Sequence, residues 1–458
     1  MKLTNKILLV LLAVVLLAVG ALWIRPPELL RVGANYSAKI VCSNVFLAHR
    51  DRSEVLAIDV QAPGNPLLRL VTIGVDARQG LVRANLLGFI GNGIAVYRNG
   101  SGCAAVPDGN IAKAKSFTYR PDPIPEPSAE VDWPAGSRVS LNAKVRQVLD
   151  NDALLGPGLR GVVVISHGKL IAERYARGFS AKTPLLGWSM TKTVNAVLVG
   201  TQIKAGRLAL LQDHFWPADG RGDGREAITL ADLLAMSSGL EFNENYGDVS
   251  DVTRMLYLEP DMAAFAFAKP LQHRPGTFWN YSTGTSMLLA RIWMQAVGAD
   301  AMRYPHNALF SPLGMSSAII EVDESGTVSG GSYMYATAQD WARFAQFLLQ
   351  DGVWNEQRML PEGFVAMMHT VAPPSEGKYG RGQVWMEGPE ARDTREDANA
   401  DAPFHLSTDI YWMQGHDGQV IALIPSLQLA VIRMGLTPDE LFYQPQSLVA
   451  AVIEALKP

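Results

Sequence analysis

The sequence predicts an α+β protein with an N-terminal membrane-spanning segment and an accessory region. Apolar runs at 161–166 and 170–175 flank a His-Gly turn, and runs at 420–425 and 429–434 flank a second short turn. Both pairs are expected to form antiparallel hairpins. Between them, apolar side chains recur at helical spacing. A chain of 458 residues is long enough for two structural units.

The N-terminus reads as an export signal. Lys2 and Lys6 border an uninterrupted run of apolar or small residues, Ile7 to Ile24. This run is just long enough to span a bilayer and rather long for a signal-peptide core. We therefore expect residues 1–24 to remain as a signal anchor, with a signal peptide cleaved after Ala21 as the alternative. Either segment directs the rest of the chain to the periplasmic, or otherwise extracytoplasmic, side of the cell envelope.

Residues 25–120 are predicted to form an accessory region of strand-like apolar pieces separated by glycine-rich turns. It holds no cluster of catalytic residue types, so its role is not predicted. The only two cysteines of the chain, Cys42 and Cys103, lie here. In an exported protein such a pair is expected to form a disulfide, and two buried thiols are the alternative. A proline-rich linker at 121–135 then leads into a second unit, 136–458.

Composition excludes several classes of function. The net charge is −4, the isoelectric point is about 6.1 and no basic stripe is present, which argues against a nucleic-acid partner. The eight histidines are scattered, and neither His-Glu-x-x-His nor Cys-x-x-Cys occurs. We therefore predict neither a metal nor a cofactor. Nothing in the sequence predicts an oligomeric state.

The second unit is expected to alternate helices with the two hairpins. Capping residues and apolar spacing predict helices at 141–155, 187–200, 228–239, 337–352 and 447–456. A polar loop is expected at 241–251. The charged stretch 387–402 is long for a structureless connection and is interpreted as a mobile lid or a disordered insertion.

The helix after Gly187 carries the first chemical motif. Ser189 and Lys192 are three residues apart, so they share one face of a helix. The run that follows is almost wholly apolar, and a buried ammonium tends to lose its proton. Lys192 can then accept the proton of the Ser189 hydroxyl. Two further Ser-x-x-Lys copies, at 166–169 and 375–378, fall in a turn and a loop, and a capping serine is the structural alternative for Ser189.

Two later segments supply candidate partners for this serine. Tyr281 stands at a loop-to-helix junction, where a tyrosine can reach into a cleft and relay a proton if nearby cations lower its pKa. His416 and Gly418 enter the strand at 420–424, where flanking glycines let a substrate backbone approach closely. The backbone N–H of Gln419, directly after Gly418, is a candidate for one arm of an oxyanion hole.

Together these motifs resemble the serine hydrolases of the class C β-lactamase and penicillin-binding-protein superfamily. Ser189-x-x-Lys192 is similar to the first motif of that family, Tyr281-Ser-Thr283 to the second (usually Tyr-x-Asn) and His416-Asp-Gly418 to the third (usually Lys-Thr-Gly or His-x-Gly). Segment 228–240 resembles the helix that follows the nucleophile in this family, and segment 330–344 resembles the branch of 6-aminohexanoate-dimer hydrolases and related esterases. The likeness covers roughly residues 130–458. It implies a β-lactamase/transpeptidase-like fold, in which an antiparallel sheet flanked by helices adjoins a mostly helical subdomain.

The resemblance also implies a set of roles. Ser189 attacks a carbonyl, Lys192 and Tyr281 handle its proton, and water releases the acyl-enzyme. The N–H groups of Ser189 and Gln419 hold the oxyanion, and which of Lys192 and Tyr281 is the base stays open. Tyr246 corresponds in spacing to a substrate-contacting tyrosine of the dimer-hydrolase branch.

Departures from the family pattern narrow the substrate. His416 replaces a lysine that pairs with a substrate carboxylate, and Thr283 is shorter than asparagine and lacks its amide donor. Both changes favour a small-molecule ester or small amide as substrate. A D-alanyl-D-alanine peptidase, a weak β-lactamase and a non-catalytic protein that binds wall fragments are the alternatives.

Overall fold

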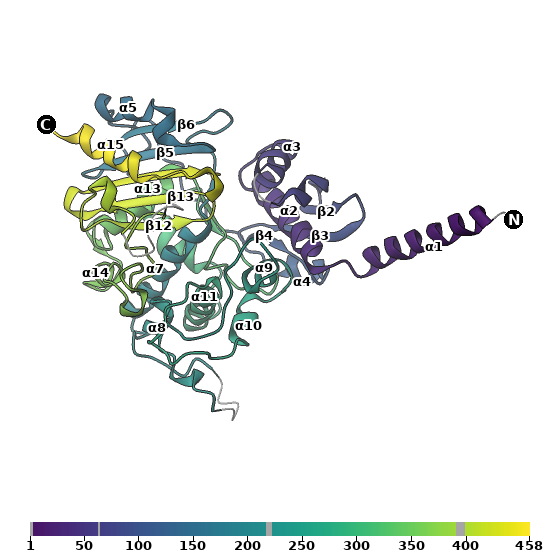
Figure 1. Ribbon diagram of the computed structural model, residues 1–458. Helices are drawn as coiled ribbons and strands as arrows, with labels where there is room; N and C mark the ends of the chain where they lie inside the picture. Colours follow the sequence, from purple (N-terminus) through teal and green to yellow (C-terminus); the bar gives the residue numbers. More distant parts are fainter. Residues whose placement is uncertain (1–2, 63–64, 217–221, 391–398) are drawn as a thin grey trace.

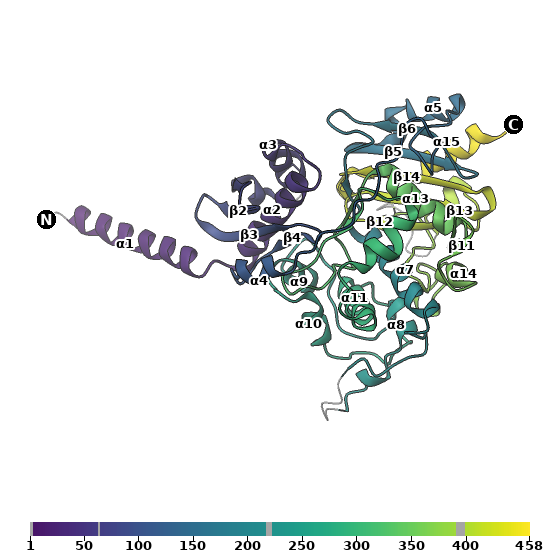
Figure 2. The ribbon, with the colours of Figure 1, turned by 180° about the vertical axis from the view of Figure 1, so that it is seen from behind.

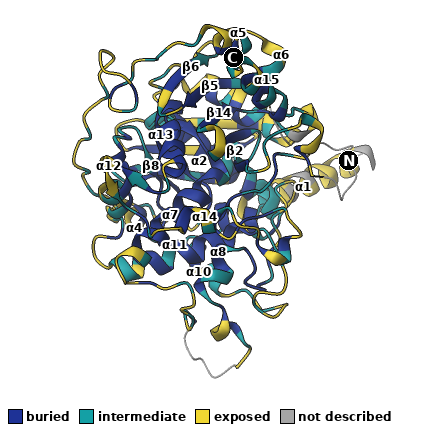
Figure 3. Ribbon diagram, turned by 90° about the vertical axis from the view of Figure 1, so that its left-hand side faces the viewer, coloured by how far each residue is buried: buried dark blue, intermediate teal, exposed yellow. Residues whose placement is uncertain are grey.

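The structure is a computed structural model that describes residues 3–62, 65–216, 222–390 and 399–458. Helix α1 (Leu3–Ile24) projects from the rest of the chain, and its described side chains are largely exposed (Figures 1 and 3). Its stretch Asn5–Ile24 is long and apolar enough to cross a membrane, by length and composition. The helix therefore fits either a signal or an anchor at the N-terminus.

The accessory region is one long helix laid on a small sheet. Helix α2 (Glu28–Phe46) packs against a four-stranded antiparallel sheet of order β1-β2-β3-β4. Gly93 of β3 allows this close approach, since a Cβ there would lie 2.2 Å from the Ala34 carbonyl oxygen. The strands are β1 (Val71–Asp76), β2 (Leu81–Leu86), β3 (Ile90–Arg98) and β4 (Gly102–Ala105), and short helices α3 (Arg52–Val55) and α4 (Ile111–Ser116) flank them. The strand-like pieces were predicted, whereas α2 was not.

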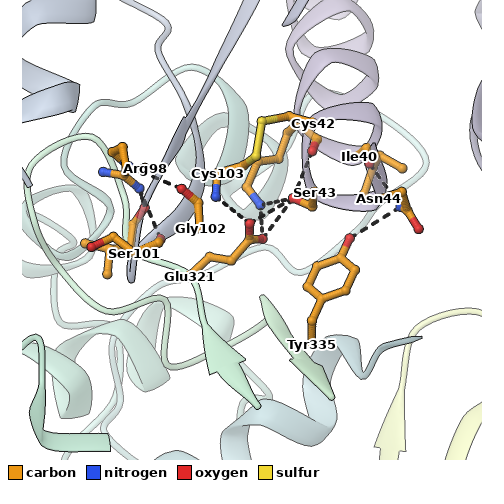
Figure 4. Close-up of a disulfide and its surroundings, with 12 residues drawn as sticks. Ile40, Cys42, Ser43, Asn44, Arg98, Ser101, Gly102, Cys103, Glu321 and Tyr335 are labelled. Atoms are coloured by element: carbon orange, nitrogen blue, oxygen red, sulfur yellow. Dashed lines mark hydrogen bonds and ion pairs between the residues drawn. A yellow bond between two sulfur atoms is a disulfide. The ribbon is translucent and has the colours of Figure 1, made fainter. Parts of the chain in front are cut away.

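The expected disulfide is present and ties α2 to β4. Cys42 and Cys103 are bonded across a sequence separation of 61 residues. Directly beneath the disulfide lies Glu321 of the second unit (Figure 4). Its buried carboxylate accepts the backbone N–H of Cys103 at 2.6 Å and the Ser43 hydroxyl at 2.9 Å, and forms an ion pair with Lys39. The accessory region is therefore fastened to the second unit.

One apolar core runs through both parts. It joins buried residues of α2 and β3 to residues of the second unit, from Val163 through Trp341 to Met434. The proline-rich segment 121–127 has neither helix nor strand and connects the two parts along the surface.

The second unit is built on a five-stranded antiparallel sheet of order β12-β13-β14-β5-β6 (Figures 1 and 2). Both predicted hairpins are confirmed, and they meet where β14 pairs with β5. Alternate residues of β5 serve different layers. Val163 and Ile165 face the main core with α13, whereas Val162 and Val164 face α5 and α15. The strands are β5 (Leu159–Ser166), β6 (Lys169–Tyr175), β12 (Tyr411–Gly415), β13 (Gln419–Ile424) and β14 (Leu429–Gly435).

Helices cover both faces of the sheet and form a subdomain beside it (Figure 2). Helix α7 is buried almost throughout and packs against α11. The helices are α5 (Ala143–Leu149), α6 (Asp152–Leu155), α7 (Thr191–Lys204), α8 (Leu230–Leu234), α9 (Asp251–Tyr257), α10 (Met262–Phe267), α11 (Thr283–Val297), α12 (Ser311–Leu313), α13 (Ala338–Leu349), α14 (Phe364–Met368) and α15 (Gln446–Leu456). Short strands β7 (Leu185–Leu186), β8 (Ile319–Ile320) and β9 (Met334–Ala336) form a three-stranded sheet, and β10 (Val353–Trp354) pairs with β11 (Gln357–Arg358).

Some predicted boundaries are corrected by local hydrogen bonding. The expected helix 141–155 is two helices, because Asn151 accepts the N–H of Ala153 and starts a new helix after α5. The expected helix 228–239 shortens to α8, whose N-terminus carries the predicted Thr229 cap as part of a capping box with Asp232. The loop expected at 241–251 contains neither helix nor strand up to Ser250, and its last residue, Asp251, is already the first residue of α9. Of the charged stretch 387–402, residues 391–398 lie outside the described chain.

Candidate active site

Ser189 stands at the start of α7, in a tight 3₁₀ turn of Trp188–Met190. Gly187 precedes the turn and has no room for a side chain, since a Cβ would lie 2.2 Å from the Trp341 ring. Trp188 has a φ of +48°, a strained conformation that a non-glycine residue rarely adopts. Trp188 is buried and Ser189 is partly exposed, so the strained turn presents the hydroxyl at a surface that a substrate can reach.

Lys192 lies one turn along, and its ammonium nitrogen is 2.9 Å from Ser189 Oγ. The predicted shared face is therefore present. The side chain of Lys192 is only 1% exposed, and burial lowers its pKa to about 8, while the charge of Glu244 partly opposes that shift. The other two Ser-x-x-Lys copies have no comparable pair: Ser166 and Lys169 face each other across the β5–β6 turn, and Ser375 bonds to local backbone carbonyls.

Three oxygen atoms surround the Lys192 nitrogen. Besides Ser189, it lies 2.9 Å from Thr283 Oγ1 and 2.9 Å from the Gly331 carbonyl oxygen. The carbonyl can only accept. Thr283 gives its own proton to Glu244, so its oxygen also accepts from Lys192. A neutral Lys192 can donate two protons to these acceptors and aim its lone pair at Ser189.

Glu244 is a site residue that the sequence reasoning missed. Its carboxylate accepts the backbone N–H of Thr283 at 2.8 Å and also the Thr283 hydroxyl. Desolvation is the largest influence on its pKa, which is raised, although Lys192 and Thr283 pull in the other direction. Thr283 therefore links the Glu244 carboxylate to Lys192. The family motif usually has asparagine at this position, and the replacement by threonine gave no indication of this link. The available signal was an acidic residue two positions before Tyr246.

Tyr281 lies beside the Ser–Lys pair, as the motif order suggested. Its ring centre is 4.9 Å from the Lys192 nitrogen, and its hydroxyl forms a hydrogen bond with Ser189. The rings of Tyr379 and Trp385 lie against it at 5.8 and 5.1 Å. The condition set for a proton relay, a pKa lowered by nearby cations, is not met: burial and the charge of Glu244 raise the pKa of Tyr281, and the Ser189 hydrogen bond offsets only part of this.

His416 and Tyr246 form the next part of the site. Their rings stack with centres 4.7 Å apart, and His416 also meets the edge of Trp188 at 5.4 Å. Tyr246 reaches back to Glu244 with its hydroxyl at 3.5 Å. Two residues predicted from different motifs are thus brought together next to the turn that holds Ser189.

Gln419 and Gly418 are oriented differently from the expectation. Gln419 pairs with Gly415 across the β12–β13 hairpin, and its buried side chain bonds to the backbone of Gly435 on β14. The Gly418 carbonyl is held by Arg433 at 2.8 Å. Both residues therefore serve the hairpin. At the edge of β12 that lies away from β13, the backbone of Trp412 points outward and exchanges hydrogen bonds with the backbone of Trp385, at 2.9 and 2.8 Å.

These features define a class of protein, a β-lactamase-fold hydrolase with a Ser-x-x-Lys pair at a helix start. The chain belongs to the β-lactamase family, whose profile matches residues 142–440. It is 25% identical over 284 residues to the 6-aminohexanoate-dimer hydrolase of Paenarthrobacter ureafaciens, covering 56% of this chain and 72% of that protein. The family resemblance drawn from the motifs is thereby confirmed.

Solved structures agree on the fold. A Bacillus anthracis protein described as a candidate 6-aminohexanoate-dimer hydrolase superposes with a TM-score of 0.57 at 17% identity, over 77% of this chain and 96% of that one. A candidate β-lactamase from Bacteroides dorei gives a TM-score of 0.51 at 19% identity, over 66% and 93%. At these identities the likeness establishes the fold alone.

Proposed function

We propose that this protein is a serine hydrolase that cleaves an ester or a small amide through an acyl-enzyme on Ser189. The observation that carries the proposal is the contact of Ser189 with a buried lysine whose pKa is about 8 and whose remaining donor positions are already occupied. With that pKa, about one-tenth of the Lys192 side chains are neutral at pH 7. Lys192 is thus the better base, because the raised pKa of Tyr281 keeps its hydroxyl protonated.

In the proposed first step, Ser189 Oγ attacks the substrate carbonyl and passes its proton to Lys192. Tyr281 then donates its hydroxyl proton to the leaving oxygen or nitrogen, and Lys192 returns a proton to Tyr281. The bond to the leaving group breaks and an acyl-serine ester remains. Water then gives a proton to the same lysine and adds to that ester; the bond from the acyl carbon to Ser189 Oγ breaks, Lys192 returns the proton to Ser189, and the acid leaves.

The oxyanion of each tetrahedral intermediate needs two donors. One is the backbone N–H of Ser189 at the helix start. For the second we propose the backbone N–H of His416 in place of that of Gln419. Backbone groups alternate along a strand, so the outward direction of Trp412 repeats at Gln414, and His416 follows in the turn directly after β12. The ring of His416 also contacts Trp188, the residue directly before Ser189.

Hydrolysis of p-nitrophenyl acetate by the full chain tests the proposal. Wild-type protein should release p-nitrophenol, and Ser189→Ala should reduce kcat/KM to the background rate. Ser166→Ala is the matched control, because Ser166 begins another Ser-x-x-Lys copy and should leave the rate unchanged. Equal rates in wild type and Ser189→Ala would refute the proposal, and rapid acylation by fluorescent penicillin would favour a penicillin-recognising enzyme instead.

A further inference from the structure

A large cavity separates the accessory region from the candidate active site. Its volume is about 1240 Å³, larger than the roughly 300–1,000 Å³ typical of small-molecule sites. One wall comes from the accessory region and includes Leu30, Ile58 and Leu67. The rest of the lining comes from the second unit and includes Trp188, Tyr246 and His416 together with charged side chains such as Arg160 and Glu244. The cavity thus extends from Trp188, the neighbour of Ser189, to an aliphatic surface of the accessory region.

The aliphatic wall is held in a fixed position. Besides the Glu321 contacts beneath the disulfide (Figure 4), Arg98 donates to the Asp323 carbonyl at 2.9 Å. Near the cavity, the ring of Tyr36 on α2 meets that of Tyr257 on α9 at 5.6 Å. A buried ion pair between Lys39 and Glu321 and an apolar core shared by both parts indicate a fixed interface and not a loosely tethered module. The cavity is therefore a built feature of the molecule.

The aliphatic wall also lies next to the apolar N-terminal helix. Helix α1 ends at Ile24, α2 begins at Glu28, and Leu29 and Leu30 of its first turn already line the cavity. Ile58 and Leu67 on the same wall are 37% and 39% exposed. Exposed aliphatic side chains around an opening indicate an apolar ligand. If α1 spans a bilayer, this opening stands within a few residues of the membrane surface.

We propose that this cavity binds the long acyl chain of a membrane-derived carboxylic ester, with the ester group beside Ser189. This inference rests on the proposed function and specifies its substrate class. Ser189 Oγ forms a bond to the acyl carbon while the bond from that carbon to the alcohol oxygen breaks. The alcohol leaves with the proton of Tyr281, and water then frees the fatty acid. The accessory region thereby acquires a role, as the wall that holds the chain.

The test is the dependence of hydrolysis on chain length, measured with the full chain in phosphatidylcholine vesicles. The probes are p-nitrophenyl acetate, butyrate, octanoate and laurate. Each buried methylene is worth at most about a fourfold gain in kcat/KM. We expect a rise of at least a hundredfold from acetate to laurate.

A matched pair of variants localises the effect. Leu67 and Leu70 belong to the same short 3₁₀ helix, Pro66–Leu70, and both are exposed, but only Leu67 lines the cavity. Leu67→Asp should lower kcat/KM for laurate at least tenfold and leave acetate unchanged, whereas Leu70→Asp should change neither. Leu30→Trp, which fills the cavity, should act like Leu67→Asp.

The outcomes separate the two claims. Hydrolysis of acetate with no gain for laurate overturns the acyl-chain site and leaves the proposed function standing. So does an equal response of laurate hydrolysis to Leu67→Asp and Leu70→Asp. Hydrolysis of none of the esters overturns the proposed function and the acyl-chain site together.

Discussion

Replacing Glu244 by glutamine should shift the pH dependence of catalysis. Glu244 and Lys192 both bond to Thr283 Oγ1, so their charged atoms lie about 5 Å apart, the length of two hydrogen bonds in series. With an effective dielectric constant between 20 and 80, their attraction is about 1–3 kcal/mol. This corresponds to roughly one to two pKa units. Glu244 raises the pKa of Lys192, so its removal must lower that pKa below its value of about 8.

A base with a lower pKa is neutral at lower pH. The acidic limb of the kcat/KM profile should therefore move from near pH 8 in the wild type to roughly pH 6–7 in Glu244→Gln. The plateau above the limb should fall by about ten- to a hundredfold, because a charge-assisted hydrogen bond worth about 1.5–3 kcal/mol no longer orients Thr283. The deficit of the variant is thus largest at high pH and narrows as the pH falls.

The assay is the initial rate of p-nitrophenyl acetate hydrolysis between pH 5.5 and 9.5, corrected for spontaneous hydrolysis. Glu241→Gln is the matched control, since Glu241 is the first residue of the same loop. Within the described chain, the carboxylate that bonds to Thr283 is that of Glu244. The profile of Glu241→Gln should match the wild type. An acidic limb that stays in place in Glu244→Gln, or moves to higher pH, would refute the role assigned to this carboxylate.

The structure makes two further predictions, one on Tyr281 and one on the disulfide. Tyr281→Phe should slow an ester with an alkyl alcohol leaving group by about 10²–10⁴-fold but a p-nitrophenyl ester much less, because p-nitrophenolate leaves without a proton; equal losses measured on the two substrates would exclude Tyr281 as the acid. Removal of the disulfide in the double variant Cys42→Ser and Cys103→Ser should lower the free energy of unfolding by about 4 kcal/mol, since the bond closes a loop of 61 residues. Urea unfolding measures this change, and an unaltered midpoint and slope would show that the accessory region unfolds independently of the disulfide.

The sequence was sufficient for features that depend on local periodicity. The spacing of Ser189 and Lys192 predicts their shared helix face, and the continuous apolar runs on either side of the turns at His167 and Ser426 predict the two hairpins of the sheet. Helix α2 escaped prediction because its buried face is rich in small and polar residues such as Ala34, Ser37 and Asn44, which give little apolar contrast.

The missed site features depend on long-range geometry. Glu244 meets Thr283 across 39 residues, and the polar loop offers several acidic residues with no local feature to select among them. The direction of the Gln419 backbone amide could not be predicted, because strand alternation decides which backbone amides face outward and a shift of one residue reverses that direction. The direction of the Tyr281 pKa shift depends on burial and the charge of Glu244 outweighing the hydrogen bond to Ser189, which only the folded structure reveals.

The central claim is that Ser189 is the nucleophile that carries the acyl group. Peptide mapping by mass spectrometry after treatment with a fluorophosphonate probe tests it most directly. We predict a single adduct on Ser189 in the wild type and in Ser166→Ala, and no adduct in Ser189→Ala. An unmodified Ser189 in the wild type, or an adduct on another residue that persists in Ser189→Ala, would contradict the account.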